Sequence, residues 1–331
     1  RLNRIKNIDY LCYNFLMPEL PEVETIRLGL QKYLVGVKPR GGHATIRGKT
    51  IEDVEIRLAK VVSGNPKDII GTKIIGVRRF GKGLVIDLSN QHSIAIHIKL
   101  TGQLLYKGTD VPKETKETKS ARDKIGGELP NKWTHVVFKL KAQSSKLKST
   151  SQNSKLKNGE YAYLYYNDLR QFGWIKIVQS SNLKLQIFFK DLGPEFFKDL
   201  TLEKFQQIVS KSNLAIKVLI MDQKKMSGVG NIYANDALFE AKIDPRRKAK
   251  ELSEAEIKKL YDATLKVLKK GLESGGASEL SYVNVLGQEG GYQKHFLVYG
   301  REGERCKKCG GEIKKIKLGG RGTYFCPKCQ I

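Results

Sequence analysis

Four cysteines near the C-terminus constrain the fold of this chain more than any other feature. Cys306 and Cys309 form one C-x-x-C pair, and Cys326 and Cys329 form a second pair after sixteen intervening residues. Two such pairs can hold four thiolates in a tetrahedron around one zinc ion. The segment 295–331 is too small to build a core without such a link. Two disulfides or chance spacing are the alternatives. We predict one structural zinc ion with no coordination position left open for catalysis.

The charge balance indicates a polyanionic partner. The 331 residues include 60 Lys and Arg against 34 Asp and Glu, a formal net charge of +26. Nucleic acid is the commonest partner for a chain this basic, although part of the charge lies in the low-complexity segment 142–160 and serves solubility there. No apolar run has transmembrane length, and polar residues interrupt residues 1–16 where a secretory signal would be apolar. We therefore expect a cytosolic protein.

The pattern of apolar residues changes along the chain. Residues 21–34 favour a helix, because Pro21 suits its first turn and apolar residues recur on one face. Short β-rich stretches follow from about 46 to 178, which predicts a β-sandwich. Residues 107–132 and 142–160 interrupt these strands, and we expect the second to be an exposed loop. After a linker, "LGPEFF", helical patterns cover residues 201–211, 214–222, 231–240 and 253–273.

A glycine turn opens the third of these helical patterns. Gly228 and Gly230 flank the turn, and Asn231 is a good N-cap for the helix that follows. Exposed amides at a helix N-terminus bind anions, so this turn is a candidate site for a nucleic-acid phosphate. Most glycine turns only reverse the chain, and the motif carries weight here only beside the cysteine pairs and the charge.

Four motifs of the chain resemble those of the bacterial formamidopyrimidine-DNA glycosylases. They are "MPELPEVETIR", "DLRQFG", "DQKKMSGVGNIYANDALFEAKIDP" and "VYGREGERCKKCG…GGRGTYFCPKCQ", and they occur in order from Met17 to Gln330. Leu20 favours this branch over the related endonuclease VIII, which opens Pro-Glu-Gly-Pro-Glu. The resemblance implies an α+β protein in which an N-terminal helix and β-sandwich face a helix–two-turn–helix domain with a zinc-finger β-hairpin. DNA runs between the two, and the damaged base is flipped into a pocket.

The resemblance also implies catalytic residues. The nitrogen of Pro18 would attack C1′ of the damaged nucleotide, displace the base and leave a Schiff base. Glu19 would protonate the sugar ring oxygen, and Glu22 would support the site electrostatically. Lys82 matches a hairpin lysine that contacts the lesion phosphates and assists the chemistry. Arg321 matches a zinc-finger arginine linked to δ-elimination and to holding a phosphate.

Further positions match DNA contacts of the family. Arg170 and Phe172 would fill the space that the flipped base leaves, and Leu100 takes the third filling position, where the family usually has methionine. Lys217 and Asn231 match contacts to the DNA.

Three positions depart from the family pattern or leave it open. "KWTH" stands where many members have Lys-His-x-His, so Trp133 replaces one histidine contact and His135 remains. Gln171 replaces a basic residue between the two filling residues. The segment 277–292 aligns with the loop over the lesion base, but its sequence does not indicate which base it prefers.

The motif that holds Pro18 lies inside the chain, which conflicts with its implied chemistry. An amide nitrogen is a poor nucleophile because its lone pair is delocalised, whereas a free N-terminal proline is a secondary amine. We therefore expect residues 1–16 to be a non-native upstream extension and Met17, which is then removed, to be the true start. The alternative is a genuine extension that is removed by processing or kept in a protein that binds DNA without cutting it.

These observations predict a domain order and a function. Residues 17–190 would form the catalytic β-sandwich domain with its loop at 142–160, residues 195–294 the DNA-binding helical domain, and residues 295–331 the zinc finger. We expect a monomeric, nucleoid-associated base excision repair enzyme that removes 8-oxoguanine and formamidopyrimidines from double-stranded DNA and nicks the strand by β,δ-elimination. An endonuclease VIII-like glycosylase for oxidised pyrimidines and a non-catalytic protein that binds damaged DNA are the alternatives.

Overall fold

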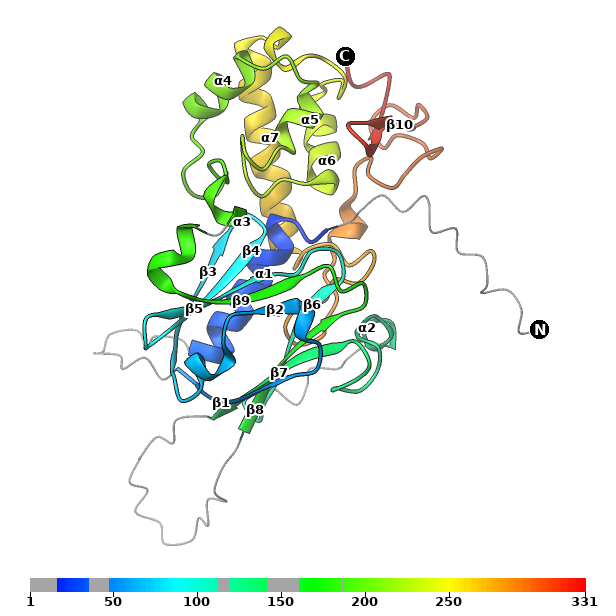
Figure 1. Cartoon of the computed structure of the whole chain (residues 1–331). Helices are drawn as coiled ribbons and strands as arrows, with labels where there is room; N and C mark the ends of the chain where they lie inside the picture. The colour runs from blue at the N-terminus through cyan, green and yellow to red at the C-terminus, as the bar shows by residue number, and fades with distance from the viewer. Residues whose placement is uncertain (1–16, 36–47, 112–118, 142–160, 186) are drawn as a thin grey trace, which may run out of the picture.

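Two sheets packed face to face fill the N-terminal lobe (Figure 1). The computed structural model describes residues 17–35, 48–111, 119–141, 161–185 and 187–331. One sheet has the strand order β1 (Thr50–Ile56), β7 (Thr134–Lys141), β8 (Tyr161–Asp168), β6 (Gly102–Lys107). The other has the order β2 (Val62–Ser63), β9 (Trp174–Gln179), β5 (His92–His97), β4 (Gly83–Leu88), β3 (Ile74–Phe80). Their pairing is antiparallel except between β2 and β9. The predicted β-sandwich is confirmed, while the loop predicted at 142–160 lies outside the described residues.

Helix α1 (Leu20–Leu30) begins where the sequence predicts. Glu19 is its N-cap and forms a reciprocal capping box with Glu22, and Pro21 occupies the first turn. A π-helical turn, η1 (Gln31–Val35), continues it. The residues that follow it, 36–47, lie outside the described residues.

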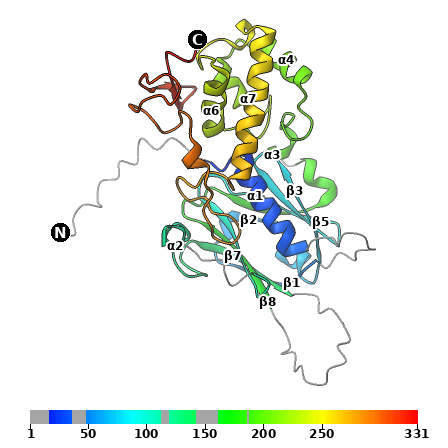
Figure 2. The ribbon, with the colours of Figure 1, turned by 180° about the vertical axis from the view of Figure 1, so that it is seen from behind.

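Helix α1 also connects the two hydrophobic cores of the molecule. Leu20 packs with the buried residues of the helical lobe. Val23, Ile26 and Leu30 pack instead into the β-sandwich. Seen from behind, α1 lies beneath the long helix α7 (Glu254–Glu273) and against the sheet that holds β3 (Figure 2). The first turn of α1, with the carboxylates of its capping box, therefore lies at the junction of the lobes.

The upper lobe in Figure 1 is helical. Besides α7 it contains α4 (Leu202–Ser210), α5 (Ile216–Ile220) and α6 (Asn231–Ala241), so all four predicted helices are present. A short helix, α3 (Ile187–Lys190), precedes this lobe. Strands β10 (Lys314–Leu318) and β11 (Arg321–Phe325) form the predicted hairpin, and its core merges with that of the helices through Ile313, Tyr324 and Cys326.

One helix was missed by the sequence pattern. The polar segment 107–132 contains α2 (Lys119–Ile125), which buries Ala121 and Ile125 against Leu105 and Val137. Two apolar residues one turn apart are too weak a signal to detect in a lysine-rich stretch, because tertiary packing supplies the stability of such a helix. None of the described helices combines the length and apolar character needed to cross a membrane.

Candidate active site and zinc centre

The carboxylate of Glu19 caps a helix of the opposite lobe. Its Oε2 accepts a hydrogen bond from the backbone N–H of Gly230 at 2.8 Å, and its Oε1 accepts one from the N–H of Ile232 at 2.8 Å. These are unpaired donors of the first turn of α6, where the helix dipole is positive. Glu19 is only 2% exposed. Burial raises the pKa of Glu19 to about 7, although the charge of Lys82 and the backbone N–H groups of Ile232 and Tyr233 oppose the shift.

Two predictions about the glycine turn are corrected by this contact. Gly230, not Asn231, is the N-cap of α6, and Asn231 is the first helical residue, with its side chain directed elsewhere. The anion at this helix N-terminus is the protein's own Glu19, so these amides are already occupied. The turn needs glycine because a Cβ on Gly230 would lie 2.3 Å from Cδ of Glu19, and Gly228 has φ +101°.

Glu22 lies one turn further along α1 and is equally buried. Its Oε1 accepts hydrogen bonds from the hydroxyl of Tyr233 and the N–H of Ala277, both at 2.7 Å, and its Oε2 accepts the N–H of Glu19 at 2.9 Å. Burial raises the pKa of Glu22, and the hydrogen bonds partly offset this rise. The chain approaches Glu22 closely at Gly276, where φ is +85° and a Cβ would lie 2.8 Å from Cγ of Glu22.

Pro18 is buried and shares a small recess with Glu22. The recess measures about 20 Å³, and Leu100, Ile232 and Tyr282 also line it. That volume is enough for about one water molecule. The loop 277–282 forms one wall, and a recess of this volume is too small for a nucleobase. The structure thus brings together Pro18, Glu22 and one of the predicted filling residues, Leu100.

Three cationic side chains approach the carboxylates from different elements. Lys82 lies buried in the turn between β3 and β4. Burial lowers the pKa of Lys82, and the negative charge of Glu19 opposes this shift while Arg321, at the start of β11, adds to it. The structure therefore brings Glu19, Lys82 and Arg321 within electrostatic range of one another, as the resemblance implies.

The third cation, Lys217 on α5, makes internal contacts. Its Nζ donates to Oδ1 of Asn231 at 2.7 Å, to the carbonyl of Gly322 at 2.9 Å and to Oγ1 of Thr323 at 2.7 Å. It is 1% exposed, and burial lowers its pKa to about 7. The structure thus gives Lys217 and Asn231 a role in holding the zinc-finger hairpin, and their contact with DNA stays a prediction.

The predicted filling residues lie on two neighbouring loops. Arg170 lies over the ring of Phe172 at 4.8 Å, and the Phe172 side chain is 51% exposed. Asp168 holds their loop, because its carboxylate accepts hydrogen bonds from the N–H of Gly173 at 2.8 Å and from the hydroxyl of Thr101 at 2.5 Å. Thr101 follows Leu100, so one buried carboxylate holds both loops.

The other two predicted DNA contacts pack against the protein. His135 is buried, and its Nε2 lies 2.8 Å from the carbonyl oxygen of Asp168. Trp133 is half-buried against Gly126, where a Cβ would lie 2.3 Å from its ring. The side chain of His135 supports the loop that carries Arg170, whereas that of Trp133 packs beside the end of α2, and whether either touches DNA stays a prediction.

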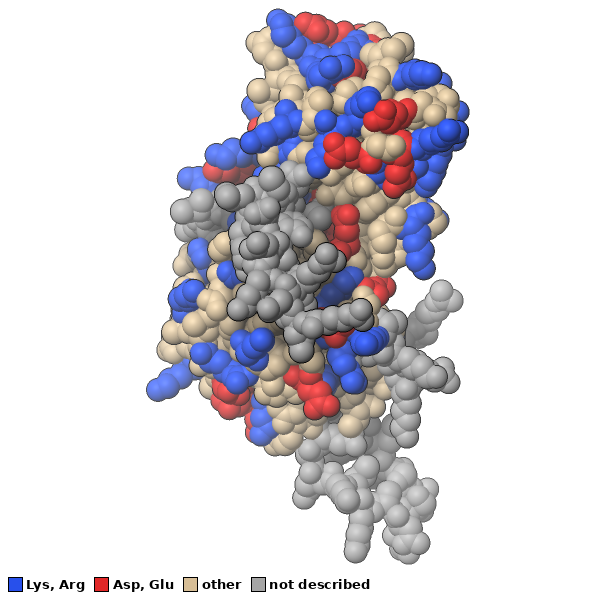
Figure 3. All heavy atoms as spheres, turned by 90° about the vertical axis from the view of Figure 1, so that its right-hand side faces the viewer, with Lys and Arg blue, Asp and Glu red and all other residues tan. Residues whose placement is uncertain are grey.

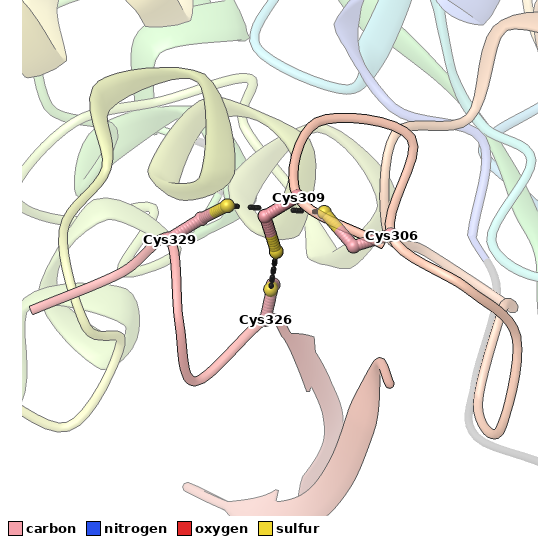
Figure 4. Close-up of side chains that lie close together, drawn as sticks. All are labelled: Cys306, Cys309, Cys326 and Cys329. Carbon is pink, nitrogen blue, oxygen red and sulfur yellow. Dashed lines mark hydrogen bonds between the residues drawn. The ribbon is translucent and has the colours of Figure 1, made fainter. Parts of the chain in front are cut away.

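The four cysteines converge as the spacing predicts (Figure 4). Their Sγ atoms all lie within 4.8 Å of one another, with Cys306 and Cys329 at 3.8 Å and Cys309 and Cys326 at 3.4 Å. Sulfurs bound at about 2.3 Å to a tetrahedral zinc ion are roughly 3.8 Å apart. The cluster therefore fits one structural zinc ion, and it offers no fifth ligand among the described residues.

Some residues of the site gave no signal in the sequence. The sequence pattern places Tyr233 on a helix and assigns it no further role, yet its hydroxyl donates a hydrogen bond to Glu22. Asp236 on α6 accepts the N–H groups of residues 297–299, which positions the chain entering the zinc finger. Arg79 and Glu195 form a buried ion pair near Lys82. A buried partner from a distant element has no periodic pattern by which a sequence could reveal it.

Positive side chains are spread over both lobes on the face that Figure 3 shows, where acidic side chains are interspersed among them. This face is the right-hand side of Figure 1, where the zinc-finger hairpin lies. The Lys and Arg side chains on both lobes are suited to contact a phosphate backbone.

Family models match three consecutive parts of the chain. The model described as "Formamidopyrimidine-DNA glycosylase N-terminal domain" matches residues 17–175. A second model, described as "Formamidopyrimidine-DNA glycosylase H2TH domain", matches residues 192–282. The model described as "Zinc finger found in FPG and IleRS" matches residues 303–331.

Similar proteins cover nearly the whole chain. The formamidopyrimidine-DNA glycosylase of Streptococcus mutans is 35% identical over 95% of this chain and 99% of its own length. That of Pelotomaculum thermopropionicum is 36% identical over 95% of this chain and 99% of its own.

Solved structures of Lactococcus lactis Fpg are also similar. A complex with abasic-site DNA has a TM-score of 0.73 at 29% identity, and a complex with DNA containing an oxidised pyrimidine has a TM-score of 0.72 at 30% identity. Both alignments cover 95% of this chain and 99% of the other. Three family models match successive parts of the chain, relatives align over nearly its whole length, and its four cysteines are placed to bind one zinc ion. The chain therefore belongs to the formamidopyrimidine-DNA glycosylase family.

Proposed function

We propose that this protein excises oxidised purines from double-stranded DNA with the nitrogen of Pro18 as nucleophile, and that it then cleaves the strand as a lyase. The arrangement of Pro18 and the two carboxylates that follow it carries this proposal. All three are buried at the junction of the lobes, and the carboxylates are held by α6 and by the loop at Ala277.

The proposed reaction begins with the free amine of Pro18. Its lone pair forms a bond to C1′ of the damaged nucleotide, and the bond from C1′ to the base breaks with the base taking the electron pair. The Pro18 nitrogen passes its own proton to the departing base, and Glu19 in its protonated form donates its proton to the sugar ring oxygen. The ring C1′–O bond then breaks, and the nitrogen and C1′ form a positively charged iminium, the Schiff base. A pKa near 7 keeps a useful fraction of Glu19 protonated at neutral pH.

The remaining residues have supporting roles in this proposal. Glu22 stabilises positive charge that develops on the Pro18 nitrogen. Lys82 and Arg321 hold the phosphates beside the lesion, and elimination then breaks the sugar–phosphate bonds. Leu100, Arg170 and Phe172 occupy the space from which the base was flipped.

The active form must begin at Pro18, because an acylated proline nitrogen cannot form an imine. The experiment therefore compares protein whose first residue is Pro18 with the 331-residue chain as its matched control. Each is mixed with a duplex that has one 8-oxoguanine opposite cytosine, and borohydride is added to reduce any imine to a stable adduct.

We expect a protein–DNA adduct mapped to Pro18 from the first protein and DNA binding without an adduct from the control. An adduct from a lysine, or the same yield from both proteins, would reject Pro18 as the nucleophile. If both proteins bind DNA but neither forms an adduct with any lesion, the alternative of a non-catalytic protein that binds damaged DNA would be favoured.

A second substrate class is tested in the same experiment. One similar structure shows Lactococcus lactis Fpg in complex with DNA containing an oxidised pyrimidine. A duplex with thymine glycol is therefore run in parallel. Faster trapping on thymine glycol than on 8-oxoguanine would assign this chain to oxidised pyrimidines. We further propose that the protein acts as a monomer, since the partners of both carboxylates among the described residues belong to the same chain. Sedimentation of the protein–DNA complex tests this: we expect the mass of one protein chain plus one duplex, and the mass of two chains would reject it.

A further inference from the structure

A buried ion-pair cluster lies beside the catalytic turn. The guanidinium of Arg79, at the end of β3, forms two hydrogen bonds of 2.6 Å with the carboxylate of Glu195. Its Nε donates to Oε2 of Glu24 on α1 at 2.7 Å. The side chains of Arg79 and Glu195 are only 2% and 4% exposed. Burial alone would lower the pKa of Arg79, but its hydrogen bonds with Glu195 and Glu24 outweigh this and raise it.

The same cluster holds the backbone of the turn between β3 and β4. Oε2 of Glu195 accepts the N–H of Gly81 at 3.0 Å, and the carbonyl of Gly81 accepts a hydrogen bond from Arg79 at 2.9 Å. Both backbone groups of Gly81 are therefore fixed. Lys82 is the next residue, so the position of its side chain depends on this turn.

The backbone of Glu195 is held by contacts within the helical lobe. It forms a bridge with Ser227, whose N–H donates to the carbonyl of Pro194 at 2.9 Å. The carbonyl of Glu195 also accepts the N–H groups of residues 198–200. Ser227 directly precedes the glycine turn whose Gly230 binds Glu19. One continuous set of contacts thus runs from the turn of Lys82 to the turn that holds Glu19.

We propose that Glu195 is a positioning residue, which fixes Lys82 relative to Glu19 by holding the β3–β4 turn against the helical lobe. This inference rests on the proposed function of Lys82 and Glu19. A misplacement of a catalytic group by about 1 Å can reduce the rate by about 100-fold. The contact between the Glu195 carboxylate and the Gly81 amide is the one that sets this position.

Glu24 supplies a matched control for the loss of a buried charge. Glu195→Gln and Glu24→Gln each leave Arg79 with one carboxylate partner. Each removes a charge from an ion pair with buried Arg79, and the side chains of Glu195 and Glu24 are 4% and 16% exposed. Only Glu195 touches the backbone of the turn. The exposed pair of Arg78 and Asp87, with the same 2.6 Å distances and side chains 47% and 19% exposed, provides a second control in Asp87→Asn.

The experiment measures single-turnover excision of 8-oxoguanine at saturating DNA, DNA affinity, and hydrogen exchange of the backbone amides, all with protein that begins at Pro18. For Glu195→Gln we expect a rate reduced by about 30- to 100-fold, an affinity within about threefold of wild type, and faster exchange at Gly81 while β4 and β5 stay protected. For Glu24→Gln and Asp87→Asn we expect a rate within about threefold of wild type.

Two outcomes overturn the inference. Equal rate losses in Glu195→Gln and Glu24→Gln would mean that the cluster only stabilises the fold. An unchanged rate in Glu195→Gln would mean that the turn keeps its position without this carboxylate. If Glu195→Gln does not fold, Glu195→Asp, which keeps the charge but shortens the side chain, must show the local exchange at Gly81 and a reduced rate. The borohydride experiment distinguishes a failure of the proposed function from a failure of this inference. If wild-type protein forms no borohydride-stable adduct with DNA, the proposed function is contradicted, whatever the Glu195 variants show.

Discussion

At the scale of single residues, Glu19 shows how two opposing effects set a protonation state. The N-terminus of α6 donates two hydrogen bonds to its carboxylate and favours the charged form. Burial disfavours that form and is the larger effect, so the pKa rises to about 7. A carboxyl group poised in this way can lose its proton to a substrate at neutral pH, which a surface glutamate with its ordinary pKa cannot do.

The raised pKa of Glu19 predicts how stability depends on pH. The folded-state pKa of about 7 lies above the ordinary value of 4.5, so the folded state binds this proton more tightly than the unfolded state. The stability contributed by the group is present below pH 4.5 and is lost as the pH rises through 7. We expect the difference in unfolding free energy between wild type and Glu19→Gln to fall steadily from pH 5 to pH 8.

Chemical denaturation of both proteins across this range measures that difference. Titration of the groups that both proteins share cancels in this difference. Any destabilisation caused by the glutamine itself adds a constant, so only the titration of Glu19 makes the difference vary with pH. A difference that is flat with pH, or one that rises, would contradict a raised pKa for Glu19. Excision by Glu19→Gln should also be reduced at every pH, by at least about 100-fold, if the proton comes from this group.

At the scale of elements, the start of α6 is built around the carboxylate that it receives. Gly230 leaves the space that Cδ of Glu19 fills, and Leu20 donates its N–H to the carbonyl of Gly228 at 3.0 Å. The first turns of α1 and α6 are thus joined end to end. Exposed polar turns tolerate substitution, whereas this turn has no room for a side chain.

Gly230→Ala should therefore damage catalysis more than stability. The added Cβ would lie 2.3 Å from Cδ of Glu19, so the carboxylate or the turn must move. We expect the excision rate to fall by about 100-fold and stability to fall by about 1–3 kcal/mol. Gly291→Ala is the matched control, because the nearest atom to its Cβ is a carbonyl oxygen at 3.6 Å, an ordinary contact. Equal rates for the two variants in single-turnover assays would rule out the steric account.

We expect the zinc-finger hairpin to depend on its metal for its position. Its core merges with the helical lobe through Cys306 and Cys326, and Lys217 binds its strand at Gly322 and Thr323. Removing zinc should release both contacts and displace Arg321, because so small a segment has little core of its own.

We expect Cys309→Ser to lose its zinc and at least about tenfold of its DNA affinity, while the sandwich keeps its fold. Lys328→Ala, which changes an exposed residue between two of the cysteines, should keep one zinc ion per chain and wild-type affinity. Metal analysis together with titration of fluorescent duplex checks both. Full affinity in a zinc-free Cys309→Ser protein would show that the finger is dispensable for binding.

At the scale of the whole molecule, the two lobes have separate cores that share α1. Leu20 is buried in one core and Val23 in the other, three residues apart. The active-site carboxylates lie on this shared helix, and their partners come from both lobes. A site of this kind is complete only when the lobes are docked, so we expect the contacts between the lobes to matter for the proposed catalysis.

The net charge of +26 predicts steep salt dependence of DNA binding. A protein that neutralises roughly six to ten phosphates loses about 10³- to 10⁵-fold in affinity between about 50 and 200 mM salt. We expect the slope of log affinity against log salt to fall by about one in Arg321→Met, and to be unchanged in Lys258→Met, whose exposed lysine pairs with Asp262 on α7. Binding that is nearly independent of salt would contradict a phosphate-dominated interface.

The sequence by itself determined the features whose signals are local. Cysteine spacing indicated the zinc centre, and apolar periodicity indicated the sandwich and all four helices of the second lobe. The motif from Pro18 to Glu22 pointed to the proposed catalytic residues through its resemblance to a family. These signals are contained in a few consecutive residues, because capping, periodicity and ligand spacing act over short distances along the chain.

Only the tertiary structure decided how those residues are paired. It placed the carboxylate of Glu19 on the amides at the start of α6, which corrected the capping role expected of Asn231. It also paired Arg79 with Glu195 across more than a hundred residues of sequence and turned Lys217 towards the zinc finger. Such contacts depend on how two lobes dock, and the energy of burying a charge or a polar group depends on what surrounds it in space.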